Sequence, residues 1–112
     1  GQTAVHQFVH IGAHTMVGGS SAIRQDIPPY VVGAGDPFRP VGINSEGLRR
    51  RGYDADVISS LKETYKLLYR RNLKIEDAAA AMRQLQLERP QASEAIEVLA
   101  SFIERPGRGI VR

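Results

Sequence analysis

Residues 5–23 read VHQFVHIGAHTMVGGSSAI, and a large aliphatic residue returns at every sixth position of this stretch. The four positions are Val5, Ile11, Val17 and Ile23. A helix repeats its apolar positions near 3.6 residues and a simple strand near 2, so neither explains the spacing. A period of six predicts a hexapeptide β-helix, in which each hexad forms one side of a triangular coil and its aliphatic side chain points to the axis. Chance alternation in an ordinary sheet is the competing interpretation.

Small residues lie where such a coil would turn its corners, at Gly12, Ala13, Gly18, Gly19, Ser20 and Ser21. Glycine suits a corner because tight turns often need a positive φ. Residues 1–35 supply about two coils, whereas a solenoid needs about three or more repeats to bury a continuous core. The period is already running by Val5, and Gly1 is not an initiator methionine. We therefore expect further coils upstream, contacts with neighbouring subunits, or both.

The character of the chain changes after the hexads. Residues 26–40 read DIPPYVVGAGDPFRP, and four prolines in fifteen residues exclude a helix there, so we predict an exit from the solenoid followed by a loop. Helical spacing of apolar residues then predicts a helix over 54–69, with Asp54 as N-cap, and two more helices on either side of Pro90. The apolar positions of these two helices are Ile75, Ala79, Met82 and Leu85, then Ile96, Leu99 and Ile103. We treat 105–112 as irregular.

Composition narrows the class of protein. The chain has 112 residues, a formal charge of +3 and no cysteine, which excludes disulfides and thiolate metal sites. No apolar run approaches the roughly 18 residues of a membrane span, and no secretory signal is visible. We therefore expect a cytoplasmic protein without membrane insertion. The first 40 residues hold two bases and two acids, so the excess positive charge lies in the remainder, where it would attract phosphate or an acidic partner.

Two stretches contain side chains capable of binding or chemistry. His6, His10 and His14 would line one face of a helix, but in hexads they point in different directions, so we predict no metal site. They are surface or inter-subunit histidines, or His6 or His14 lines a ligand cleft. Residues 42–53, GINSEGLRRRGY, place Asn44, Glu46 and three arginines together. The planar guanidinium suits phosphate, although a solvated basic turn is the alternative.

Several motifs together resemble the C-terminal part of bacterial UDP-N-acetylglucosamine O-acyltransferases, the family that starts lipid A synthesis. They are TAVHQF (3–8), IGAHTMVGG (11–19), QDIPPYVV (25–32), GINSEGLRRRG (42–52), YKLLYR (65–70) and RGIVR (108–112). QDIPPYVV is similar to many hexapeptide acyltransferases. The specific feature is NSEGLRRRG following a TAVHQF coil.

This resemblance implies a fold and an assembly. Residues 1–35 are expected to form the terminal coils of a left-handed parallel β-helix, 36–52 a connecting loop and basic turn, and 53–112 a small α-helical C-terminal domain. It also implies a homotrimer with active sites between subunits.

The implied reaction is acyl transfer from acyl carrier protein. The carrier delivers a 3-hydroxyacyl thioester, which the 3-hydroxyl of UDP-N-acetylglucosamine attacks. A histidine acts as general base and a backbone N–H stabilises the oxyanion, without a metal or organic cofactor. By resemblance that histidine lies upstream of Gly1, so we expect no catalytic residue in this chain and no activity of the chain alone.

The resemblance also assigns binding residues. The set implied for the nucleotide sugar is His6, Gln7, Asn44, Glu46, Arg50 and Arg51, with Arg50 the first candidate for the diphosphate. Met16 and Gly19 match the acyl-chain groove, and glycine at the second position leaves the groove long. The residues implied for docking the acidic carrier protein are Lys66, Arg70, Arg71 and Lys74.

Other functions stay open at this point. One is a different hexapeptide acyl- or acetyltransferase. Another is a non-catalytic module that trimerises or binds an acidic protein. Nucleic-acid binding is disfavoured because the chain has no set of aromatic residues for base stacking.

Overall fold

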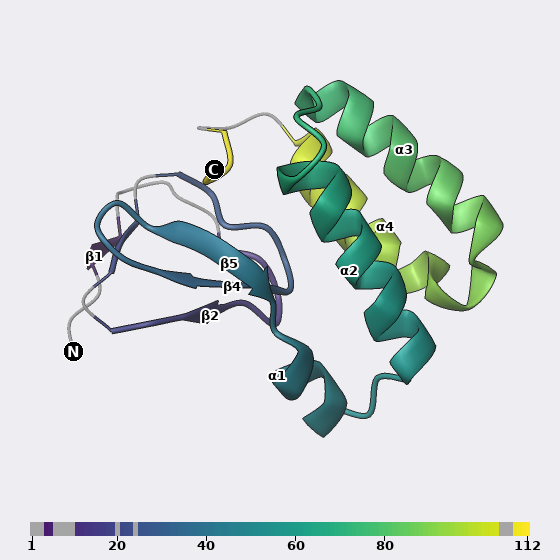
Figure 1. Ribbon diagram of the computed structural model, residues 1–112, viewed down its shortest axis with the longest axis horizontal. Helices are drawn as coiled ribbons and strands as arrows, with labels where there is room; N and C mark the ends of the chain where they lie inside the picture. The colour runs from purple at the N-terminus through teal and green to yellow at the C-terminus, as the bar shows by residue number, and fades with distance from the viewer. Residues whose placement is uncertain (1–3, 6–10, 20, 24, 106–108) are drawn as a thin grey trace.

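The computed structural model describes residues 4–5, 11–19, 21–23, 25–105 and 109–112. Short strands lie on one side of the molecule and three helices on the other, with a fourth, short helix at the junction (Figure 1). The strands are β1 (Ala4–Val5), β2 (Met16–Val17), β3 (Ala22–Ile23), β4 (Val31–Ala34) and β5 (Arg39–Ile43). The helices are α1 (Ser45–Arg50), α2 (Ala55–Tyr69), α3 (Ile75–Glu88) and α4 (Ser93–Glu104), with a 3₁₀ turn at Pro90–Ala92.

The strands pair in parallel with neighbours 16 to 18 residues away. Val5 of β1 lies opposite Ile23 of β3, which is a separation of three hexads. Ile11 bridges to Ile27, and Met16 of β2 lies opposite Val32 of β4. A parallel pair needs a connection that returns the chain to the same edge. The pair of Val5 with Ile23 fits the six-residue period, whereas the other two pairs are 16 residues apart.

Gly12 and Gly18 are needed for a different reason from the one predicted. Neither has a positive φ; the described glycines that do are Gly35, Gly52 and Gly109. A Cβ on Gly12 would lie 2.2 Å from the backbone nitrogen of Pro29, and one on Gly18 would lie 2.7 Å from Cβ of Ala34. These neighbours belong to the segment that pairs in parallel about 16 residues later, here called the next pass of the chain. The glycines therefore allow two passes to approach closely, rather than allowing a tight turn.

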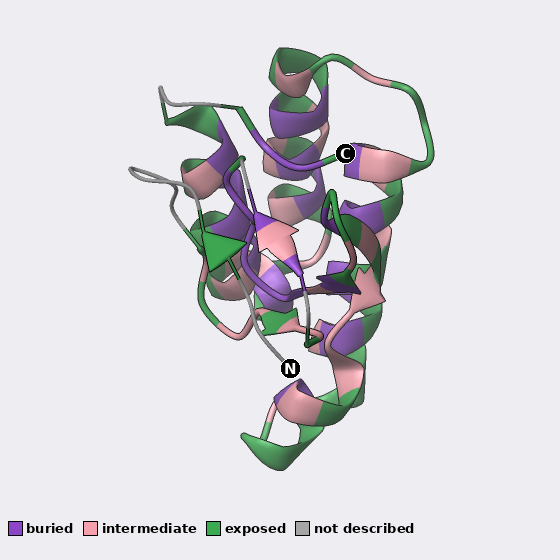
Figure 2. Ribbon diagram, turned by 90° about the vertical axis from the view of Figure 1, so that its left-hand side faces the viewer, coloured by how far each residue is buried: buried purple, intermediate pink, exposed green. Residues whose placement is uncertain are grey.

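Only part of the predicted aliphatic row is buried. Ile23 is 1% exposed and packs with Ile27 and Val31, and Val17 lies at the edge of this cluster. Val5 and Ile11 are 49% and 44% exposed, and Figure 2 shows β1 on the open surface. The described residues thus form two small sheets packed with helices. In the strand part, the buried apolar residues start at Ile23 of β3.

The helical part agrees with the predicted periodicity. α2 begins directly after Asp54, which occupies the N-cap position but makes no side-chain capping bond. As expected, α3 ends before Pro90, at Glu88, and α4 begins after it, at Ser93. Their shared core buries Leu61, Met82, Ile96 and Leu99. The guanidinium of Arg83 on α3 forms ion pairs with Glu97 and Glu104 and so links α3 to α4.

Two segments are more ordered than the sequence predicts. The stretch 36–52, expected to be a loop and a turn, contains β5, antiparallel to β4, and α1. Pro40 is tolerated because β5 is an edge strand. The C-terminal segment, expected to be irregular, bridges Asp26 through Ile110. Burial explains this, since Ile110 and Val111 are 8% and 4% exposed.

Within the described ranges, no helix combines the length and hydropathy needed to cross a membrane.

The close approach of successive passes is testable by adding one methyl group. Gly12→Ala is expected to lower the free energy of unfolding by about 1–3 kcal/mol, because the new Cβ meets the backbone of Pro29. Gly42→Ala is the matched control, since no atom lies within 4 Å of the added Cβ there. Urea unfolding followed by circular dichroism measures both. Equal stabilities of the two variants would contradict the close approach.

Candidate functional site

The predicted nucleotide-binding motif folds into α1, which presents charged side chains to solvent. Leu48 is fully buried and anchors the helix. Glu46 accepts hydrogen bonds from Nη1 of Arg49, at 3.1 Å, and is paired with Nε of Arg50, at 3.3 Å. The Arg50 side chain is 78% exposed, and its Nε lies 3.3 Å from Oε1 of Glu46. A guanidinium this exposed is accessible to an anion, which arginine can bind through two parallel hydrogen bonds.

Asn44 is held within the protein by both ends of its amide. Its Oδ1 accepts from the backbone N–H of Gly47, at 3.2 Å, which caps α1, and its Nδ2 donates to the backbone oxygen of His14, at 3.0 Å. A side chain at position 47 would collide with this amide, because a Cβ there would lie 2.5 Å from Asn44 Nδ2. Asn44 thus fixes the start of the helix and keeps one N–H for a ligand.

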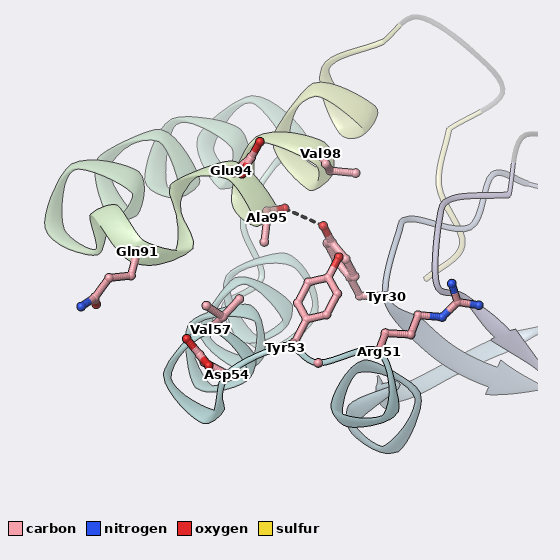
Figure 3. A pocket seen from close by; sticks show the side chains of 10 residues that line it. Tyr30, Arg51, Tyr53, Asp54, Val57, Gln91, Glu94, Ala95 and Val98 are labelled. Carbon is pink, nitrogen blue, oxygen red and sulfur yellow. Dashed lines mark hydrogen bonds between the residues drawn. The ribbon is translucent and has the colours of Figure 1, made fainter.

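Three aromatic rings lie beside α1. His14 lies nearly parallel to Tyr30, with ring centroids 5.9 Å apart, and Tyr53 meets His14 edge-on at 5.5 Å. The Tyr30 hydroxyl donates to the backbone oxygen of Ala95 in α4, at 2.8 Å (Figure 3). Burial raises the pKa of Tyr30, and the neighbouring Tyr53 raises it further. Tyr30 therefore stays neutral and acts as a fixed support.

A pocket of about 510 Å³ opens between the end of α1, α2 and α4. Figure 3 shows the rings of Tyr30 and Tyr53 side by side, while Arg51 extends away from them towards the strands. The pocket is lined by Tyr30, Arg51, Gly52, Tyr53, Asp54, Val57, Gln91, Glu94, Ala95 and Val98. It combines an aromatic wall with polar and acidic groups, and it adjoins the arginine-bearing helix.

A second pocket, of about 520 Å³, lies between β5 and α2 and has a basic rim. Lys62, Lys66 and Arg70 recur every fourth residue and so share one face of α2. The guanidinium of Arg70 lies over the ring of Tyr65, at 5.9 Å from the centroid. The resemblance implies Lys66 and Arg70 but not Lys62, which the four-residue spacing adds to the set. Arg71 and Lys74 follow α2 and are not among the residues that line this pocket.

The structure brings together only part of the predicted site. Asn44, Glu46, Arg50 and Arg51 lie at or beside α1. Met16 lies on β2 and is 52% exposed, and Gly19 lies in the exposed turn after it. His6 and Gln7, like His10, lie outside the described residues. In the part of the chain that the structure describes, no three His, Cys, Asp or Glu side chains are grouped so as to hold a metal ion.

Comparisons with known proteins all find the same family. A family model described as UDP N-acetylglucosamine O-acyltransferase, domain 2, matches residues 26–111. An acyl-[acyl-carrier-protein]–UDP-N-acetylglucosamine O-acyltransferase of Paraburkholderia phymatum is 51% identical over the whole chain, which spans 43% of that relative's length.

Solved structures give the same result. LpxA of Acinetobacter baumannii is 39% identical, with a TM-score of 0.87, and the match covers 98% of this chain and 42% of that one. The UDP-N-acetylglucosamine O-acyltransferase of Moraxella catarrhalis is 38% identical, with a TM-score of 0.90, and the match covers 100% and 42% of the two chains.

The buried tyrosine predicts a loss of stability in alkali. An unfolded tyrosine ionises near pH 10.0, whereas burial raises the pKa of Tyr30 above this value. Above pH 10.0 the unfolded chain therefore loses a proton that the folded chain keeps. The free energy of unfolding then falls as pH rises, by up to about 1.4 kcal/mol per pH unit for this residue.

Denaturant unfolding at a series of pH values measures this slope. Tyr30→Phe is expected to be less stable at neutral pH by about 1 kcal/mol, because the Ala95 carbonyl loses its donor. Its alkaline slope should also be shallower. An unchanged slope in the variant would assign the alkaline transition to another group.

Proposed function

Because the chain belongs to the UDP-N-acetylglucosamine O-acyltransferase family, whose model matches residues 26–111, we propose that it forms the nucleotide-sugar-binding part of such an enzyme. The enzyme transfers a 3-hydroxyacyl group from acyl carrier protein to the 3-hydroxyl of UDP-N-acetylglucosamine, in lipid A synthesis. The observation that carries the proposal is α1, where the NSEGLRRRG motif places Glu46 and Arg50 on one short, anchored helix and Arg51 at its C-cap.

In this proposal residues 1–35 are the terminal coils of a left-handed parallel β-helix. The support is the parallel register of Val5 with Ile23, three hexads apart, and the close approach at Gly12 and Gly18. The proposed assembly is a homotrimer. Exposed apolar side chains outside the hexad row support it, because such surface is usually covered by a partner. They are Met16 and Val41, at 52% and 65% exposed.

The acceptor is proposed to bind at α1. A diphosphate carries two charges, and the exposed guanidinium groups of Arg50 and Arg51 can each donate two parallel hydrogen bonds to it. Glu46 can accept from a sugar or ribose hydroxyl while holding Arg50 in place. Asn44 contributes its remaining N–H. His6 and Gln7 are proposed to line the same cleft by their match to the family motif.

The donor is proposed to approach from the strands and α2. Met16 and Gly19 line the groove for the acyl chain, and glycine leaves that groove long. The acidic carrier protein docks on the basic face of α2, where Lys66 and Arg70 rim the second pocket. Arg71 and Lys74, which follow α2 in the chain, are proposed to contact the carrier as well.

Removal of one guanidinium tests the acceptor site. Arg50→Ala is expected to raise the Kd for UDP-N-acetylglucosamine about tenfold or more, because a hydrogen bond to a charged group is lost. Isothermal titration calorimetry measures this, and light scattering on the same samples relates binding to assembly. Arg105→Ala, at the other end of the helical part, should bind like the parent. Unchanged affinity in Arg50→Ala would refute the proposed site.

Charge reversal tests the donor side. Lys66→Glu and Arg70→Glu are expected to abolish binding of acyl carrier protein, and binding to the parent should weaken as salt rises from about 50 to 500 mM, because exposed charges are screened. Arg105→Glu is the control of equal charge change. Carrier binding without any binding of UDP-N-acetylglucosamine would favour an interaction module that lacks an acceptor site.

A further inference from the structure

The position of α1 needs an explanation, because the proposed function requires its arginines to face the diphosphate. The helix has six residues, and a helix this short is not stable by its own hydrogen bonds. Leu48 anchors its buried side. One buried residue fixes the depth of a helix but leaves it free to rotate and tilt, so its orientation depends on contacts at its two ends.

The residues that flank α1 on both sides contact His14. At the start, the Nδ2 of Asn44 donates to the backbone oxygen of His14, at 3.0 Å. After the end, the hydroxyl of Tyr53 lies 3.3 Å from Nε2 of the His14 ring, and one of the two groups donates according to the tautomer. The backbone N–H of Tyr53 also donates to the oxygen of Leu48, at 3.1 Å, so Tyr53 moves together with the helix.

His14 is itself held in an unusual position. Its φ of 58° lies in the left-handed region, which few residues other than glycine adopt. The backbone oxygen of the preceding Ala13 accepts from the N–H of Tyr30, at 2.8 Å, and the His14 ring lies nearly parallel to that of Tyr30. Tyr30 is fixed to α4 through the oxygen of Ala95. The imidazole is therefore a rigid reference point that joins the turn at residues 13–14 to the helical part.

We propose that His14 and Tyr53 are positioning residues for the acceptor site, an inference that rests on the proposed function. They act through α1, by fixing its orientation, rather than through a contact with the nucleotide sugar. The bond between the imidazole and the phenol holds the end of α1, so that Arg50 and Arg51 face the diphosphate before it binds. Preorganised arginines lose less freedom on binding, so this bond acts on affinity.

The test separates orientation from stability. Tyr53→Phe keeps the ring and removes the hydroxyl. His14→Asn removes the ring, while asparagine tolerates the left-handed backbone and keeps the carbonyl that binds Asn44. Each is expected to raise the Kd for UDP-N-acetylglucosamine about fivefold in calorimetry. Because both variants remove the same bond, the double variant should be no weaker than the weaker single variant.

The controls distinguish a failure of the positioning role from a failure of the proposed function. Tyr69→Phe removes a tyrosine hydroxyl on α2 outside this cluster and should leave the Kd unchanged. If Arg50→Ala weakens binding while Tyr53→Phe and His14→Asn do not, the positioning role is refuted and the proposed function stands. If Arg50→Ala has no effect, both are refuted. If the two single effects add in the double variant, the shared bond is refuted. Should His14→Asn fail to fold, Tyr53→Phe decides alone.

Discussion

The contact between Gly12 and Pro29 is the constraint on which the candidate site depends. The segments around Gly12 and Pro29 approach so closely that no side chain fits on Gly12. Two backbone hydrogen bonds fix how these segments are aligned: the Gly12 N–H donates to the oxygen of Ile27, and the Tyr30 N–H donates to the oxygen of Ala13. This register places the turn that carries His14 directly beside Tyr30. The aromatic cluster, and through it the position of α1, is thus a consequence of backbone spacing in the strands.

The strand and helical parts are held together at several points. Tyr30 is buried in the helical core although it belongs to the strand side, and its hydroxyl binds α4. The C-terminal residues return to the strands, where the N–H of Val111 donates to Asp26, while the Arg112 guanidinium donates to the oxygen of Leu68 at 3.0 Å. These contacts make the junction rigid. A binding helix at such a junction can be held in one orientation without being long.

The two basic surfaces differ in a way that suits different partners. On α1, two of the arginines are ordered by Glu46, and the neighbouring pocket has an aromatic wall, so a small anion can be met with defined geometry. On α2, cations repeat along one helix face beside an apolar groove. Repeated exposed cations attract an extended acidic surface more than they recognise a single group. This contrast is consistent with the proposal of a nucleotide sugar at the first surface and a carrier protein at the second.

Sequence periodicity alone located α2, α3 and α4, because each buries a stripe of apolar residues at helical spacing and Pro90 separates the last two. The spacing of aliphatic residues predicted a coiled β-structure, with which the parallel pair of Val5 and Ile23 agrees, and the motif around Arg50 remains the predicted binding segment. The tertiary structure decided the rest. β5 and α1 form in a proline- and glycine-rich stretch, and Ile110 and Val111 find their place beside Asp26, only because distant segments supply partners for their backbone and apolar groups. The bond between His14 and Tyr53 joins residues 39 positions apart, and no local pattern encodes a contact that depends on how two separate turns are brought together.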